Sequence, residues 1–411
     1  MQFRTQSGLG RSCCTFASAV RDAGNGGVSV HAGLRSGGAV AIAPHPGSQP
    51  GPSRRRGDAK SAKGTVINRR SVKHVPEGTV RVGPLRAVPS ILVEHGLDPA
   101  AVCAAARVDL RALDDDENWI SFRSVGILLE ECAARTRCPH FGLLVGQRFE
   151  LDSLGVLGDL MRNSPTVRDA LRAAALHLGI HDRGAVSLTL DFSDTLAALG
   201  YSLLDSSMPA ADQILDGAIA IQYRLLRALC GPSWQPISVQ ISHKRPARIA
   251  PFEKYFRTRV EFDAELSAIA FDRRWLDTNI HGADPAKHRA ILKAVESAAS
   301  QEDFTFVEQV RRAIYVMTFT GAASSPNLAQ FFGLHERTLR RRLAEQGTTA
   351  RALAGAVCHG IACHLLRHTS MPISAIAALL QYSDGAVFAR AFRSRSGASP
   401  GEWRARTAAT R

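Results

Sequence analysis

Hydrophobic residues repeat every three or four positions along much of the chain after residue 84. This spacing places them on one face of a helix. It predicts helices over residues 86–96, 98–107, 121–135, 154–161, 166–178 and 210–229. The middle of the chain therefore supplies amphipathic helices that need a partner to cover their apolar faces.

The pattern changes after residue 184. Apolar and polar residues alternate over residues 185–192 and 237–242, and more loosely over residues 197–203. Alternation is typical of a strand with one buried face. The middle region, residues 84–300, is therefore predicted to be an α+β domain.

Two short helix–turn–helix patterns follow one another in the last quarter of the chain. They span residues 325–343 and residues 371–393. Each second helix carries two inward-facing apolar residues four positions apart: Leu339 with Leu343, and Phe388 with Phe392. We predict an all-α domain over residues 301–411.

Start and stop signals support both patterns. Ser325 is predicted to be the N-cap of the first helix, and the proline after it takes the first helical position. Proline is tolerated there because the N–H that it lacks would have no partner within the helix. Gly333 ends that helix. Ser383 or Asp384 caps the second helix of the second unit, and Gly397 ends it.

The outward positions of the second helices are mostly arginine. Arg337, Arg340 and Arg341 face out of the first unit, and Arg390 and Arg393 face out of the second. A solvated helix usually mixes charge signs, whereas arginine forks onto phosphate and onto guanine. The pattern predicts double-stranded DNA as a partner.

A helix of about twenty residues, 349–368, is predicted between the two units, because apolar residues recur in it every four positions. At 1.5 Å per residue it is a rod of about 30 Å. Successive major grooves on one side of DNA are roughly 34 Å apart. One chain is thus predicted to place both units in adjacent grooves.

This quarter of the chain resembles the DNA-binding domain of the AraC/XylS family of bacterial transcription regulators. The resemblance lies in residues 337–343, 376–383, 388–393 and 397–400. It implies base-reading positions at Arg337, Arg341, Ala386 and Arg390, and activation of transcription through contact with RNA polymerase.

Two departures from the family pattern lie in the second unit. Gln381 stands where the family usually has glycine at a left-handed turn, which strains a residue with a side chain. Gly385 and Ala386, at the start of the last recognition helix, offer little side chain to bases. The second unit is therefore expected to bind mostly through its backbone and Arg390.

The middle region resembles the arabinose-binding-type sensor and dimerisation domain of the ornithine-utilisation-regulator-like branch of that family. Its landmarks are residues 118–122, 139–143, 154–158, 164–171 and 251–263. The resemblance implies a small-molecule effector and a homodimer.

The resemblance transfers no effector-contacting residue. Aromatic side chains with polar tips suit a pocket for a small polar ligand, which makes candidates of His177, His181, Tyr201, Tyr223 and Trp234. An ordinary core position is the competing interpretation for each.

The net charge of +14 lies at the two ends of the chain. Residues 1–83 are rich in Gly, Ser, Pro and Arg, and are expected to be a disordered basic extension. A competing hypothesis places the true start at Val66 or Val80. Residues 321–411 are also basic, as a DNA-binding domain requires.

Other chemistries are weakly supported. The eight cysteines have no paired spacing, which indicates reduced thiols in the cytoplasm, and no apolar run approaches the length of a membrane span. A helix would separate Cys358, His359, Cys363, His364 and His368 onto different faces, so no metal or other cofactor is expected. Phosphate-binding glycine loops and nucleophile motifs are missing, which argues against an enzyme.

The sequence thus predicts a cytoplasmic, nucleoid-associated activator that responds to a small metabolite, an amino acid or related compound being the first class to consider. The competing hypothesis is a constitutive, ligand-independent repressor or architectural DNA-binding protein.

Overall fold

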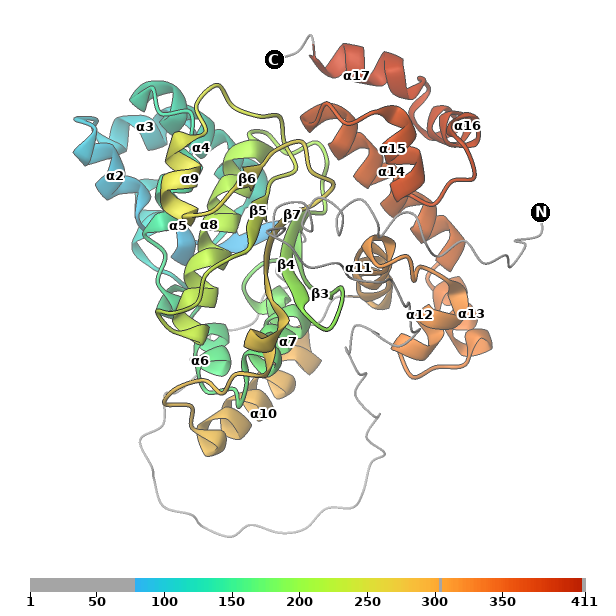
Figure 1. Ribbon diagram of the computed structural model, residues 1–411, viewed down its shortest axis with the longest axis horizontal. Coiled ribbons are helices and arrows are strands. Elements are labelled where there is room, and N and C mark those ends of the chain that lie inside the picture. Colours follow the sequence, from blue (N-terminus) through green and yellow to red (C-terminus); the bar gives the residue numbers. More distant parts are fainter. Residues whose placement is uncertain (1–77, 303–304, 409–411) are drawn as a thin grey trace.

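The computed structural model describes residues 78–302 and 305–408 (Figure 1). They form a middle domain, residues 78–302, and a C-terminal domain, residues 305–408. The α+β and all-α classes predicted for these two domains are confirmed. Almost all of the predicted basic extension lies outside the described residues.

A five-stranded sheet is the centre of the middle domain. Its strands are β3 (Ala185–Asp191), β4 (Leu196–Leu203), β5 (Ser238–Gln240), β6 (Val260–Glu261) and β7 (Ser267–Asp272). They lie in the order β3-β4-β7-β5-β6, and all neighbours are antiparallel except β5 and β6.

Strand β7 was not predicted. It is buried along almost its whole length because it pairs with β4 on one side and β5 on the other. A strand buried on both faces shows no alternation of apolar and polar residues, which is the signal that revealed its neighbours.

The helices of the middle domain largely follow the predicted segments. They are α2 (Val88–Glu94), α3 (Pro99–Ala105), α4 (Phe122–Thr136), α5 (Phe141–Gln147), α6 (Val156–Arg162), α7 (Val167–His177), α8 (Ala211–Cys230), α9 (Ala250–Phe256) and α10 (Pro285–Glu302). Short 3-10 turns occupy Gly83–Leu85, Leu110–Asp114, Leu151–Leu154, Leu178–Ile180 and Arg273–Asp277. Helices α5, α9 and α10 were not predicted.

The start of the middle domain lies before residue 83. Strand β1 (Thr79–Arg81) pairs with β2 (Trp119–Ser121) in a small antiparallel sheet. Val80 and Val82 are buried in the core. Residues that the sequence assigned to a disordered extension therefore belong to the folded domain.

The C-terminal domain is built of helices α11 (Phe306–Phe319), α12 (Ser325–Phe331), α13 (Glu336–Glu345), α14 (Ala350–His368), α15 (Ile373–Leu379), α16 (Gly385–Ser396) and α17 (Pro400–Ala408). Helices α11 and α17 were not predicted. Helix α11 starts with a capping box in which Thr305 and Glu308 satisfy each other's backbone N–H groups.

The two faces of the sheet have different partners. Ala197, Leu199 and Ile269 pack toward α8. Val186, Leu188 and Ala198 share a core with the C-terminal domain. In Figure 1 the sheet accordingly stands between the helices of the middle domain and α11.

Within the described residues, no single helix is both long and apolar enough to cross a membrane. Helices α13 and α14 together would be long and apolar enough, but they are bent by 76° relative to each other.

Candidate DNA-binding face and sensor cavity

Helices α12 and α13 form the first helix–turn–helix unit. The hydroxyl of Ser324, rather than the predicted Ser325, caps α12 by accepting from the backbone N–H of Asn327. Leu339 and Leu343 bury one side of α13 against the core. The turn between the helices passes through Gly333, whose φ is +61°.

Burial of those leucines leaves the opposite side of α13 exposed. Arg337, Arg340 and Arg341 all lie on that exposed side. Arg341 also forms an exposed ion pair of 3.6 Å with Glu345, one turn later. Such a surface pair contributes little to stability, so Arg341 can exchange it for a phosphate or a base.

Helices α15 and α16 form the second unit. Asp384 caps α16 by accepting from the backbone N–H groups of Val387 and Ala386, both at 2.8 Å. The bond from Val387 contributes most to holding the pKa of Asp384 below its usual value. The carboxylate is therefore charged at physiological pH and stabilises the first turn of α16.

The exposed side of α16 differs from that of α13. Phe388 and Phe392 are buried in the core. Their burial directs four of the predicted contact positions to solvent: Gly385, Ala386, Arg390 and Arg393. The second unit therefore presents two small residues at the start of its helix and two arginines further along.

Helix α14 joins the two units as predicted. Thr349 caps it by accepting from the backbone N–H of Ala352 at 3.1 Å, and its 19 residues measure about 28 Å. Val357, Ile361 and Leu365 pack into the same core as α11 and both units. One continuous core thus holds the two units at a fixed spacing.

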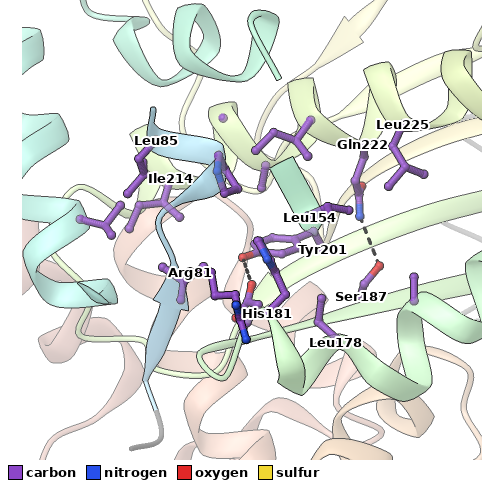
Figure 2. Close-up of a pocket in the computed structure, with 18 of the residues that line it drawn as sticks. Arg81, Leu85, Leu154, Leu178, His181, Ser187, Tyr201, Ile214, Gln222 and Leu225 are labelled. Carbon is purple, nitrogen blue, oxygen red and sulfur yellow. Dashed lines mark hydrogen bonds between the residues drawn. The ribbon is translucent and has the colours of Figure 1, made fainter. Parts of the chain in front are cut away.

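A cavity of about 130 Å³ lies in the middle domain, between the sheet, α8, α4, α5 and β1. Most of its lining is aliphatic. Figure 2 shows three polar lining residues, Tyr201, His181 and Gln222, which come from β4, the turn after α7, and α8; a dashed line joins Gln222 to Ser187. The cavity thus combines a hydrocarbon lining with a few polar groups.

The polar groups beside β4 form a buried network. Tyr201 donates its hydroxyl to Oδ2 of Asp182 at 2.7 Å, and Oδ1 of Asp182 accepts from the backbone of Gly184 and Ala185. Burial raises the pKa of Asp182, although these hydrogen bonds oppose the rise. Burial, with help from the charge of Arg81, lowers the pKa of His181 to about 3.

The candidate effector-contacting residues are not gathered in one place. His181 and Tyr201 line the cavity, whereas His177, at the end of α7, does not. Tyr223 packs edge-on against Trp234, with ring centroids 5.5 Å apart, in an aromatic core. These two residues occupy the ordinary core positions that formed the competing interpretation.

Sequence reasoning missed Asp182 and Gln222. Gln222 is the more informative omission, because it is a polar residue on a helix whose neighbouring positions are nearly all buried. A buried amide requires hydrogen-bond partners. Its position within an apolar helix was therefore a signal that the sequence contained.

Hydrogen bonds tie the middle domain to the C-terminal domain. The hydroxyls of Ser202 and Tyr315 are 2.6 Å apart, and Arg312 donates to the carbonyl oxygen of Ala185 at 2.7 Å. On α14, Nε2 of His364 lies 3.2 Å from the carbonyl oxygen of Ser242. Both α11 and α14 are thus attached to the domain that holds the cavity.

Comparison with known families agrees with this two-part architecture. Residues 96–280 match the N-terminal arabinose-binding domain of AraC transcription regulators. Residues 328–406 match a helix-turn-helix domain. The two matches fall on the domain with the cavity and on the domain with the exposed arginines.

Individual relatives match along most of their length. The chain is 27% identical to the HTH-type transcriptional regulator VirS of Mycobacterium tuberculosis, over 79% of this chain and 96% of that protein. It is also 27% identical to the ornithine utilization regulator of Pseudomonas aeruginosa, with the same coverage. The crystal structure of the transcriptional regulator CdpR from Pseudomonas aeruginosa matches with 24% identity and a TM-score of 0.39, over 74% of this chain and 95% of that one.

Proposed function

The chain belongs to the AraC family of DNA-binding transcriptional regulators, and from this premise we propose that a small molecule bound in the cavity controls its binding to DNA. The protein acts as a homodimeric activator in the cytoplasm, associated with the nucleoid, and contacts RNA polymerase when bound at its operator. It is a regulator rather than an enzyme, like its relatives.

The observation that carries this proposal is the position of strand β4. Tyr201, on one face of the sheet, lines the cavity. Ser202, the next residue, points to the other face and bonds to Tyr315 of α11. Because neighbouring residues of a strand point to opposite faces, a ligand that moves Tyr201 also moves the attachment of the C-terminal domain.

A second connection supports the same route. Asp182, which holds the Tyr201 hydroxyl, is followed within three residues by Ala185. The carbonyl oxygen of Ala185 accepts from Arg312 of α11. Ligand binding at the cavity wall therefore acts on α11 at two hydrogen bonds, and α11 shares its core with both helix–turn–helix units.

The DNA-binding side of the proposal assigns roles to the exposed residues. Arg337 and Arg341 of α13 read bases, while Arg340 binds phosphate. In the second unit Gly385 and Ala386 let the backbone approach DNA, and two arginines complete the contact: Arg390 at the bases and Arg393 at the phosphates.

Titration of purified full-length protein with DNA tests the coupling. Operator affinity is measured with and without each member of a panel of small metabolites, amino acids and apolar compounds included. An active compound should change the affinity by roughly 5- to 150-fold. Tyr315→Phe, which removes the hydroxyl bonded to Ser202, should reduce that change, while Tyr255→Phe, in the middle domain, should not.

The constitutive hypothesis makes the opposite prediction. A ligand-independent repressor or architectural protein would give the same DNA affinity with every compound. That result would leave the DNA-binding role in place and remove the regulatory one.

A further inference from the structure

The size of the cavity limits its occupant. A volume of about 130 Å³ is close to that of an aliphatic protein cavity of roughly 150 Å³ that accommodates benzene. A molecule with one ring, or a short chain of similar bulk, fits this space. Its walls are hydrocarbon, supplied mainly by Leu85, Leu129, Leu157, Met161, Leu199 and Leu225.

One residue of the cavity lining, Gln222, has a buried acceptor atom without a partner among the described residues. Nε2 of Gln222 donates to the carbonyl oxygen of Gly200 at 3.0 Å. A carbonyl oxygen can only accept a hydrogen bond, so the amide nitrogen of Gln222, and not Oε1, has to face Gly200. Oε1 therefore remains as an acceptor for another donor. Oε1 is buried and has no hydrogen-bond partner among the described residues, and the side chain is only 5% exposed.

His181, another residue of the cavity lining, also has a buried atom without a hydrogen-bond partner among the described residues. Nδ1 of His181 has no hydrogen-bond partner among the described residues, and His181 is 4% exposed. Its low pKa makes the ring neutral at physiological pH. A neutral imidazole nitrogen accepts or donates one hydrogen bond but offers no charge to a ligand.

The ionic groups of the lining are already engaged. The Asp182 carboxylate accepts from Tyr201 and from two backbone N–H groups. Arg81 is ion-paired with Glu117 and donates Nε to the carbonyl oxygen of Ile180 at 2.8 Å. An amino acid would carry two charges into this hydrocarbon space, where desolvation is costly.

We propose that the cavity binds a small uncharged molecule, mostly hydrocarbon and about one ring in size, whose hydroxyl or N–H group donates to Oε1 of Gln222. His181 forms the second polar contact at the turn after α7. Phenols and cyclic or short-chain alcohols are the simplest members of this class. The inference names the effector class for the regulatory function proposed above and rests on it.

Two ligands of nearly equal shape test the role of Gln222. Phenol and toluene are titrated into purified full-length protein, and binding is followed by calorimetry. Phenol should bind about tenfold more tightly, as expected for one hydrogen bond to a buried acceptor. In Gln222→Leu the preference for phenol should disappear while toluene still binds, which also shows that the variant is folded.

Two further variants and a charged competitor complete the design. Gln147→Leu makes the same substitution on α5, outside the cavity lining, and should keep the phenol preference. Ala218→Leu adds a larger side chain to the cavity wall, leaves less space in the cavity, and should weaken the binding of both phenol and toluene. Phenylalanine, a zwitterion with the same ring, should not compete with phenol.

The outcomes separate this inference from the regulatory proposal. Failure of phenol to bind the wild type, or an unchanged phenol preference in Gln222→Leu, overturns the ligand class. Operator affinity is measured in the same samples. Binding of phenol with the expected preference but no change in operator affinity supports the cavity chemistry and overturns the regulatory role of the cavity.

Discussion

The two helix–turn–helix units share one backbone design but present different surfaces to DNA. At the turn of the first unit, the backbone N–H of Gly333 donates to the carbonyl oxygen of Gln330, and the N–H of the next residue donates to the carbonyl oxygen of Ala329. In the second unit the backbone N–H of Gln381 donates to the carbonyl oxygen of Ala378, and the N–H of the next residue donates to that of Ala377. Both turn residues are left-handed, with φ of +61° and +60°.

This likeness shows that the turn geometry does not depend on glycine. The same pair of backbone hydrogen bonds closes each turn, and the core on both sides holds it in place. The difference lies in the second helices, since α13 exposes a row of arginines and α16 begins with glycine and alanine. The first unit is therefore expected to read DNA with side chains, and the second by close backbone approach.

The largest effect is expected from removing arginines of α13. The double variant Arg337→Ala/Arg341→Ala should lose roughly 1–3 kcal/mol of binding free energy per arginine at a specific site. Competition titrations should also show relaxed base preference. Arg123→Ala, an exposed arginine in the middle domain, is the matched control, and equal losses in both proteins would remove α13 from the interface.

A smaller effect is expected from the second unit. Arg390→Ala should lose affinity by the amount of a single contact, about 1–3 kcal/mol.

Arg393→Ala should lower affinity for all sequences alike and reduce the slope of log affinity against log salt by about one. A slope unchanged by Arg393→Ala would show that this arginine binds no phosphate.

A further substitution tests close approach at the start of α16. A methyl group added at Gly385 would meet no atom within 4 Å, so Gly385→Ala should fold normally and still bind DNA several-fold more weakly. Gly360→Ala adds a methyl group to open space on α14 and serves as the control. Wild-type affinity in Gly385→Ala would mean that the backbone stays away from the DNA.

The smallest effect concerns the turn itself. Gln381→Gly removes the strain of a side chain on a left-handed backbone, which stabilises the folded state. Glycine also gives the unfolded chain more conformational freedom, which lowers the free energy of unfolding, so the two effects partly cancel. The variant should be stabilised by less than about 1 kcal/mol in thermal unfolding, with DNA affinity unchanged. Marked destabilisation would show that the Gln381 side chain supports the turn.

The C-terminal domain could be predicted from sequence because its signals are local. Caps, turn residues and a four-residue period placed helices α12 to α16 and the exposed arginines, apart from a one-residue shift of the cap to Ser324. Helix α11 was missed although Thr305 and Glu308 carry a capping-box pattern. The angle between the units depends on the shared core, which local patterns do not describe.

The cavity could not be predicted in the same way because distant segments assemble it. Arg81, His181 and Gln222 come from a strand, a turn and a helix that are far apart along the chain. Aromatic residues with polar tips proved an ambiguous guide, since His181 and Tyr201 line the cavity while Trp234 is fully buried in the core. Only the tertiary packing of helices, turns and strands brings these residues together.

Hydroxyl-radical footprinting of the full-length protein on DNA upstream of its gene tests the account most directly. Two protected regions should lie about 34 Å apart on one side of the duplex. The Arg337→Ala/Arg341→Ala variant should lose one region, and Arg390→Ala should weaken the other. A single protected groove, or loss of the same region in both variants, would contradict the assignment of one groove to each unit.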